Sequence, residues 1–207
     1  ISSLCSRSKS WASMVDRLSG RAWDIVVDGA NVGLTDGKNF NVLRLLEVVT
    51  QLESLGKTVL VVLHRHHERR GKSGTESVRA AWKYLIPFVF APEPGMNDDW
   101  CWLYAAMIRQ GCLLVSNDLM KDHTFIMSSP PFFEKWKETH CVTFSPTCRR
   151  GVSLSFPVPY ARTVQNAQGC WVFPRVGSDE WLCAYPSIEN PLWTNVGSHA
   201  SAVAERT

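Results

Sequence analysis

The sequence has few of the features that would place the chain in a membrane or an oxidising compartment. Its apolar runs, such as 59–63 and 85–91, are far too short to span a bilayer. Its seven cysteines are an odd number and include no Cys-x-x-Cys pair, which argues against a disulfide framework and favours a reducing compartment. No Ser-His-Asp or Cys-His arrangement is evident, so we do not expect catalysis through a covalent intermediate.

The sequence also lacks a strong excess of one charge. Its net charge is +3 with a pI near 8.5, which is weaker than the basic signature of a dedicated nucleic-acid binder. The 207 residues, 45% of them hydrophobic, suffice for one sizeable core with a small appendage. Because the chain begins with Ile1, we expect a piece of a longer protein whose targeting segment is not in this sequence.

What the sequence does contain is a set of acids at the ends of predicted elements. A buried strand over 22–27 runs into Asp28, and the next residues, Gly-Ala-Asn, allow a tight turn and the close approach of a ligand. A second apolar run over 112–118 ends in Asp118. The β-α-β order of the elements predicts a parallel sheet, and the C-terminal strand ends of such a sheet form the crevice where ligands bind.

Two more acids open a predicted helix. The segment 98–107 begins with Asp98 and Asp99, with Asn97 or Asp98 as its N-cap. Helical spacing predicts that its buried face consists of Trp100, Leu103, Tyr104 and Met107.

Carboxylates that converge on one crevice are the ligands that a hard divalent cation prefers. We therefore expect one or two Mg²⁺ or Mn²⁺ ions, partly bound through water, and metal-assisted hydrolysis of a phosphodiester. The predicted metal ligands and catalytic residues are the same four acids: Asp28, Asp98, Asp99 and Asp118.

Longer motifs around these acids resemble a known family. The sequence is similar to the metallonuclease domain of proteinaceous RNase P, within the wider NYN/PIN-like nuclease group. The resemblance rests on DGANVGL (28–34), NDDWCWLYAA (97–106) and CLLVSNDLMKDH (112–123), and extends through 132–137 to 181–183. The second motif is specific, whereas the first alone is only suggestive.

The resemblance implies both a fold and an activity. The fold is an α/β structure, with a parallel central sheet flanked by helices in a PIN-like three-layer sandwich and a small antiparallel β appendage. The activity is that of an endoribonuclease that removes the 5′ leader of precursor tRNA. The implied partners are the tRNA, an upstream pentatricopeptide-repeat region and accessory protein subunits, in a mitochondrion or a nucleus.

We expect four segments along the chain. A lead-in helix over 1–19 precedes the nuclease domain over 20–147. A β-rich appendage over 148–188, which includes a short strand at 152–156, resembles a remnant of the family's zinc-bearing central region. Residues 189–207 show little periodicity and are expected to form a loosely ordered tail.

Other polar residues near the predicted strand ends are candidates for supporting roles. Asn31, Asp122 and His123 are candidates for orienting water or the metal ligands. The basic loop over 64–72 contains three histidines whose spacing suits no familiar zinc pattern, so we interpret it as either a phosphate-contacting loop or a solvated surface loop. Its candidate phosphate contacts are Arg65, Arg69, Arg70 and Lys72.

The zinc site that the resemblance implies is incomplete here. The family holds zinc with a Cys-x-x-Cys pair, the His of a Trp-His pair and the Cys of a Trp-Leu-Cys run. Of these ligands, this sequence has only the Cys of the Trp-Leu-Cys run, which is Cys183. Val172 stands where the His is expected. Cys170 shares a strand face with position 172 and is a substitute ligand, but we favour ordinary thiols at Cys170 and Cys183 and expect no stoichiometric zinc.

Three alternative functions stay open. An NYN-type nuclease acting on other RNA would share the acids, and only the Trp-rich motif argues against it. A phosphatase of the haloacid-dehalogenase type would need a second Asp where Ala30 stands. A non-catalytic RNA-binding scaffold domain would be expected to lack one or more of the acids.

Overall fold

The structure is a computed structural model, in which the chain forms two compact units. The first unit comprises Ile1–Ser128 and His140–Pro157, and the second comprises Ser129–Thr139 and Val158–Thr207. The described residues are 9–35, 39–67, 74–126, 130–147, 151–158, 165–167, 170–174, 181–184 and 196–198. Within these ranges, no helix has the length and apolar character needed to cross a membrane.

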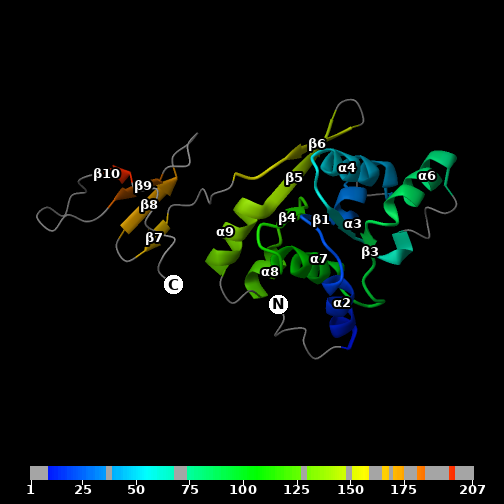
Figure 1. Cartoon of the computed structure of the whole chain (residues 1–207), viewed down its shortest axis with the longest axis horizontal. Helices are drawn as coiled ribbons and strands as arrows, with labels where there is room; N and C mark the ends of the chain where they lie inside the picture. Colours follow the sequence, from blue (N-terminus) through cyan, green and yellow to red (C-terminus); the bar gives the residue numbers. More distant parts are fainter. Residues whose placement is uncertain are drawn as a thin grey trace, which may run out of the picture. The chain divides into compact units, whose positions relative to one another are not determined.

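A six-stranded sheet forms the centre of the first unit (Figure 1). Its strand order is β3-β2-β1-β4-β5-β6, and every pair is parallel except β5–β6, so the predicted parallel sheet is confirmed. The strands are β1 Ile25–Asp28, β2 Val59–Val62, β3 Val89–Phe90, β4 Leu113–Val115, β5 Cys141–Pro146 and β6 Val152–Ser155. The two central apolar strands, β1 and β2, are buried along their whole length, as strands covered on both faces must be.

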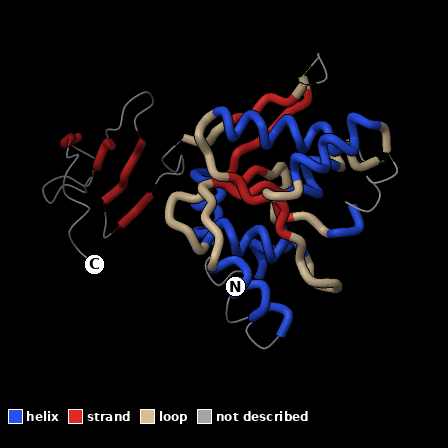
Figure 2. Tube along the Cα trace, turned by 45° about the vertical axis from the view of Figure 1, so that its right-hand side comes forward, coloured by secondary structure: helices blue, strands red, loops and turns tan. Residues whose placement is uncertain are grey.

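Helices lie on both sides of this sheet (Figure 2). Helix α7 packs with α2, where the rings of Trp11 and Tyr104 meet edge to face at 5.1 Å, and the Trp23 indole donates to the Ala105 carbonyl at 3.2 Å. The helices are α2 Lys9–Ser19, α3 Gly29–Gly33, α4 Val42–Ser54, α6 Glu76–Leu85, α7 Asp98–Met107, α8 Lys121–Ile126 and α9 Pro130–His140.

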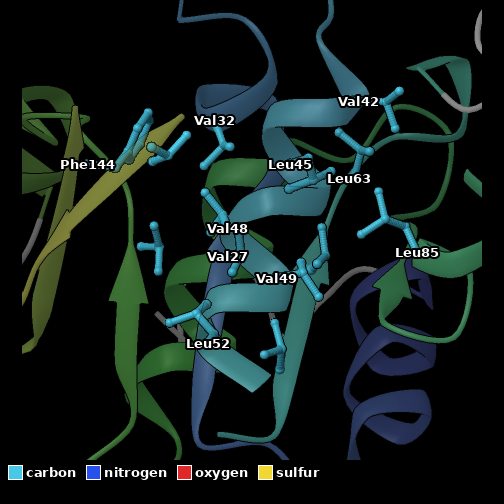
Figure 3. Close-up of a cluster of buried hydrophobic side chains, with 14 of the residues drawn as sticks. Val27, Val32, Val42, Leu45, Val48, Val49, Leu52, Leu63, Leu85 and Phe144 are labelled. Carbon is cyan, nitrogen blue, oxygen red and sulfur yellow. The ribbon is translucent and has the colours of Figure 1, made fainter. Parts of the chain in front are cut away.

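A hydrophobic core cluster lies between β1, β2 and the helices α4 and α6 (Figure 3). Helix α4 contributes Leu45, Val48, Val49 and Leu52, which are fully buried and spaced as one face of a helix. Val27 of β1 points into the same cluster. Each such side chain contributes about 1.5–3 kcal/mol by leaving water, so this cluster fixes the sheet that carries the acids.

The segment after Asp28 forms a short helix, α3, where the sequence analysis expected only a tight turn. Close neighbours explain why both ends of this helix are glycine, the residue without a Cβ atom. A Cβ on Gly29 would lie 3.0 Å from the Val62 carbonyl oxygen of β2, and a Cβ on Gly33 would overlap the Phe40 ring. Gly29 therefore lets the helix pack closely on β2, and Gly33 leaves room for the Phe40 ring.

Two expectations about packing are wrong. The buried residues of α7 are Cys101, Trp102, Leu103, Ala105 and Ala106, whereas Trp100, Tyr104 and Met107 are only half-buried. Because α7 is apolar on nearly every side, its periodicity cannot select the inner face. The strand expected at 152–156 in the appendage is β6, which instead pairs antiparallel with β5 at the edge of the main sheet.

The second unit contains the small antiparallel sheet that was expected, with strand order β10-β9-β8-β7. Its strands are β7 Gln165–Ala167, β8 Cys170–Pro174, β9 Trp181–Ala184 and β10 Val196–Ser198. Strand β10 pairs with β9 and lies within the segment expected to be a loose tail; the rest of 189–207 lies outside the described residues. The expected boundaries of the four segments stay a prediction.

Candidate active site

The structure brings the four predicted acids to one open pocket of about 480 Å³ at the C-terminal edge of the sheet. Asp28 ends β1, Asp98 and Asp99 begin α7, and Asp118 follows β4. The residues that line the pocket are Asp28, Ala30, Asn31, Leu34, Thr35, Asp98, Asp99, Asn117 and Asp118. Neither Lys nor Arg is among these lining residues, so within the described part the acids that line the pocket are not paired with a Lys or Arg of the lining.

Asp28 is the most buried of the four acids, with 4% of its surface exposed. One carboxylate oxygen accepts from the Asn31 backbone N–H at 3.0 Å, which caps α3, and the other accepts from the Ser116 hydroxyl at 3.0 Å. Burial, with smaller contributions from the carboxylates of Asp99 and Asp98, raises the pKa of Asp28 to about 7, against the two hydrogen bonds that lower it. A bound cation would relieve this cost.

Asp118 is held by the backbone around it. Its own N–H donates to the Ser116 hydroxyl at 3.1 Å, and its carboxylate accepts from the Met120 N–H at 2.9 Å. Met120 has φ 53°, in the left-handed region that side chains other than Gly rarely adopt, and its side chain is buried. Burial of Met120 and the short turn beneath it therefore fix the direction of the Asp118 carboxylate.

Two asparagines tie the strand ends together. The Asn117 side chain makes two hydrogen bonds with the backbone of Phe144 in β5, donating to its carbonyl at 2.7 Å and accepting from its N–H at 3.0 Å. The Asn117 N–H donates to the Asn31 side chain at 2.9 Å. Asn31, a predicted supporting residue, thus acts by linking the end of β1 to the end of β4, while Ser116 and Asn117 were missed by the sequence analysis.

The acids of α7 sit in its first turn. Asn97 is the N-cap, and its side chain accepts from the Asp99 N–H at 2.7 Å. Burial raises the pKa of Asp99, with further contributions from the carboxylates of Asp98 and Asp118, while His123 opposes the rise. The positive end of the helix dipole favours acids at this position.

Of the other predicted supporting residues, His123 is placed near the site and Asp122 is exposed. The His123 ring is 93% buried and packs against Trp100 and Trp102, with ring centroids 4.6 Å and 6.0 Å away. These tryptophans therefore hold in place the ring that opposes the rise in the pKa of Asp99.

The three histidines after β2 have three different surroundings. His64 Nε2 lies 3.8 Å from Asp98 Oδ1, so the loop touches the acid pocket. His67 is buried and packs on the Phe40 ring at 4.6 Å, while His66 is exposed. Arg65 is also exposed, whereas the other candidate phosphate contacts, Arg69, Arg70 and Lys72, lie outside the described residues.

The donor set of the pocket fits a divalent cation bound in part through water. Within the described ranges, no three His, Cys, Asp or Glu side chains stand close enough together to hold a metal ion directly. Mg²⁺ usually keeps several of its waters and takes only one or two carboxylates directly, which suits acids spaced around an open pocket. Burial and neighbouring carboxylates raise the pKa values of Asp28 and Asp99, so a bound cation would stabilise their charged forms.

In the second unit, Cys170 and Cys183 are half-buried free thiols on neighbouring strands. Val172 pairs with Cys183, so Cys170 lies on the same face of the sheet, diagonally across from Cys183. Burial raises the pKa of the Cys183 thiol, and the nearby Cys170 thiol raises it further. Two thiols supply only two of the four ligands of a tetrahedral zinc site. The expectation that the chain binds no stoichiometric zinc stays a prediction.

Comparison with known proteins points to one family. A sequence model described as protein-only RNase P matches residues 6–189. The Arabidopsis thaliana protein named Proteinaceous RNase P 1, chloroplastic/mitochondrial, is 37% identical over 175 residues, or 78% of this chain and 30% of that protein. The Mus musculus protein named Mitochondrial ribonuclease P catalytic subunit is 25% identical over 175 residues, or 82% of this chain and 29% of that protein.

Solved structures agree with this comparison. The structure of Arabidopsis thaliana nuclear protein-only RNase P 2 is similar with a TM-score of 0.70 and 31% sequence identity, over 87% of this chain and 40% of that chain. The chain spans about 30% of the length of the curated relatives that it matches.

Proposed function

Because the chain belongs to the protein-only RNase P family, we propose that it carries the nuclease activity that removes the 5′ leader of precursor tRNA. The observation that supports this proposal is the convergence of Asp28, Asp98, Asp99 and Asp118 on one pocket. These acids come from three separate segments of the chain, and their mutual repulsion is retained at a cost to stability, which is typical of a functional site.

The four acids would hold one or two Mg²⁺ or Mn²⁺ ions. When bound, a divalent cation supplies the positive charge that activates water and offsets the charge on the phosphodiester. The protein's own residues position and orient: Ser116 and Asn31 hold the Asp28 carboxylate, and the Met120 N–H holds that of Asp118. His123 adds a buried imidazole beside Asp99.

The names of the relatives support the wider setting of the proposal. They describe a mitochondrial catalytic subunit and chloroplastic or mitochondrial proteins, and we propose a mitochondrion or a nucleus as the compartment. In the full-length protein, an upstream pentatricopeptide-repeat region would bind most of the tRNA, with or without accessory subunits. The present chain would then cleave with weak affinity of its own.

Cleavage assays test the proposal. A 5′-extended precursor tRNA and an unstructured RNA of equal length are incubated with the chain in excess over RNA, so that weak affinity does not hide activity. We expect one cut at the mature 5′ end of the tRNA with Mg²⁺ and no cut with EDTA. Equal cutting of both RNAs would instead support a less selective NYN-type nuclease, and no cutting at all would support a non-catalytic RNA-binding domain.

A pair of variants locates the activity within the pocket. Asp118→Asn should reduce the cleavage rate by more than the roughly 10–100-fold that is typical of residues outside the direct ligand set. Asp16→Asn, an exposed acid of α2, is the matched control and should cleave at the wild-type rate. Near-normal cleavage by Asp118→Asn would contradict the assignment of the acid pocket.

A further inference from the structure

Among the described residues, the Asp98 carboxylate accepts none of the hydrogen bonds that hold the strand-end acids. Asp28 accepts two hydrogen bonds and Asp118 accepts one, and each of these bonds fixes a carboxylate oxygen. In the part of the chain that the structure describes, the basic side chain within 4 Å of the Asp98 carboxylate is the imidazole of His64. This histidine is therefore placed to orient Asp98.

The position of His64 is well defined by the sheet. It follows β2, the strand next to β1, and the N–H of the preceding residue, Leu63, donates to the Phe90 carbonyl at 3.1 Å. The His64 carbonyl accepts from the His67 N–H at 3.1 Å, which turns the chain back immediately. The backbone around His64 is therefore held, and its ring lies beside that of the exposed His66 with centroids 5.6 Å apart.

The geometry presents Nε2 of this ring to the pocket. Nε2 lies 3.8 Å from Asp98 Oδ1, and the two side chains are similarly accessible, with 21% and 23% of their surfaces exposed. The distance is about 1 Å longer than a hydrogen bond, within the range that a small side-chain rotation closes. A neutral imidazole protonated on Nε2 can donate here, so the contact does not require a charged ring.

We propose that His64 is a positioning residue for Asp98, whose Nε2–H group holds the Asp98 carboxylate in the orientation that binds the cation. The inference rests on the proposed function, because it assumes that Asp98 is one of the cation-binding acids. Hydrogen bonds to the ligands of a metal typically change its affinity by about 10–100-fold, which sets the size of the expected effect.

Three variants separate the donor group from the ring itself. His64→Phe keeps an aromatic ring for the contact with His66 but removes the N–H donor. His64→Gln keeps an N–H donor at a similar reach and removes the ring. His66→Ala is the matched control, because it removes the same stacking contact from the exposed neighbour and leaves the contact with Asp98 in place.

The measurement is Mn²⁺ affinity of the whole chain, obtained by titration with electron paramagnetic resonance of the free ion. Thermal unfolding in EDTA checks that each variant is folded. We expect His64→Phe to bind Mn²⁺ about 10–100-fold more weakly than wild type. His64→Gln should recover most of the affinity, and His66→Ala should bind like wild type.

The outcomes distinguish this inference from the proposed function. If wild type binds Mn²⁺ and His64→Phe binds it equally well, His64 does not position Asp98 and the inference is wrong. The same conclusion follows if His64→Gln is as weak as His64→Phe, because the ring rather than the donor would then matter. If wild type binds no Mn²⁺, the proposed function itself fails, and the inference fails with it.

Discussion

The Ser116 hydroxyl links two of the pocket acids: it donates to the Asp28 carboxylate at 3.0 Å and accepts from the Asp118 N–H at 3.1 Å. Ser116 is 2% exposed and lies directly after β4, the strand that pairs with β1. One buried hydroxyl thus sets the spacing between the ends of two neighbouring strands.

Removing that hydroxyl should damage both stability and activity. Ser116→Ala leaves a buried carboxylate oxygen and a backbone N–H without their partner, and each unsatisfied group costs about 1–3 kcal/mol. We expect a lower free energy of unfolding in urea and slower RNA cleavage. Ser145→Ala, at an exposed position of β5, is the control and should match wild type in both measurements. An unchanged unfolding midpoint for Ser116→Ala would contradict this role.

The raised pKa of Asp28 predicts how the stability of the metal-free protein depends on pH. Because folding raises this pKa from 3.8 to about 7, the folded state holds the proton more tightly than the unfolded state. The stabilising contribution of protonated Asp28 is complete below pH 4 and is lost as the pH rises through 7. At pH 8 in EDTA, Asp28→Asn should therefore be more stable than wild type, by up to about 4 kcal/mol.

Urea denaturation at pH 5 and pH 8 measures this difference, with Asp16→Asn as the exposed control. Added Mg²⁺ should stabilise wild type at pH 8 and have little effect on Asp28→Asn, because only the wild-type pocket keeps all its ligands. A variant that is less stable than wild type at pH 8 would show that the Asp28 charge is compensated within the protein.

The loop over 64–72 should contribute to RNA affinity through phosphate contacts. Replacing Arg69 and Arg70 with Ala should weaken binding of precursor tRNA and reduce the slope of log affinity against log salt by about one to two units. The cleavage position should not move, because phosphate contacts carry no sequence information. Lys83→Ala, on the exposed side of α6, controls for the loss of any surface charge. An unchanged slope would assign the loop to the solvated surface.

We predict that the chain binds no stoichiometric zinc. Cys170 and Cys183 lie together on β8 and β9, but Val172, the direct partner of Cys183, offers no ligand atom. Metal analysis of the chelator-washed protein should find less than one zinc per chain, and Cys183→Ser should change the unfolding midpoint little. One tightly held zinc that disappears in Cys183→Ser would reverse the prediction.

Elements with one clearly buried side or with both sides buried carry the clearest sequence signal. Runs such as 59–62 are apolar because both sheet faces are covered, and the spacing of Leu45, Val49 and Leu52 follows the single buried face of α4. Helix α7 was placed correctly along the chain, but of its predicted inward residues only Leu103 is buried, since the helix is apolar around most of its circumference. Periodicity carries no information about such a helix.

The supporting residues of the site were harder to predict than the acids. An acid at a strand end is visible in the sequence, but the partner of a hydroxyl or an imidazole depends on which strands become neighbours. Ser116 reaches Asp28 only because β4 pairs with β1, and His64 reaches Asp98 only because β2 lies on the other side of β1. These two contacts could be predicted only from the strand order β3-β2-β1-β4, which the sequence does not state.

The strand order also has a consequence for when the acid pocket can assemble during synthesis. Asp28 is synthesised before the other three acids, and Ser116, which holds its carboxylate, lies 88 residues later. A nascent chain that has emerged only as far as β3 contains one of the four acids, and the central pairing of β1 with β4 is not yet available. Pairings between segments so distant along the chain slow folding. A growing or half-folded chain therefore has no assembled acid pocket, and under the proposed function it would not yet cleave RNA.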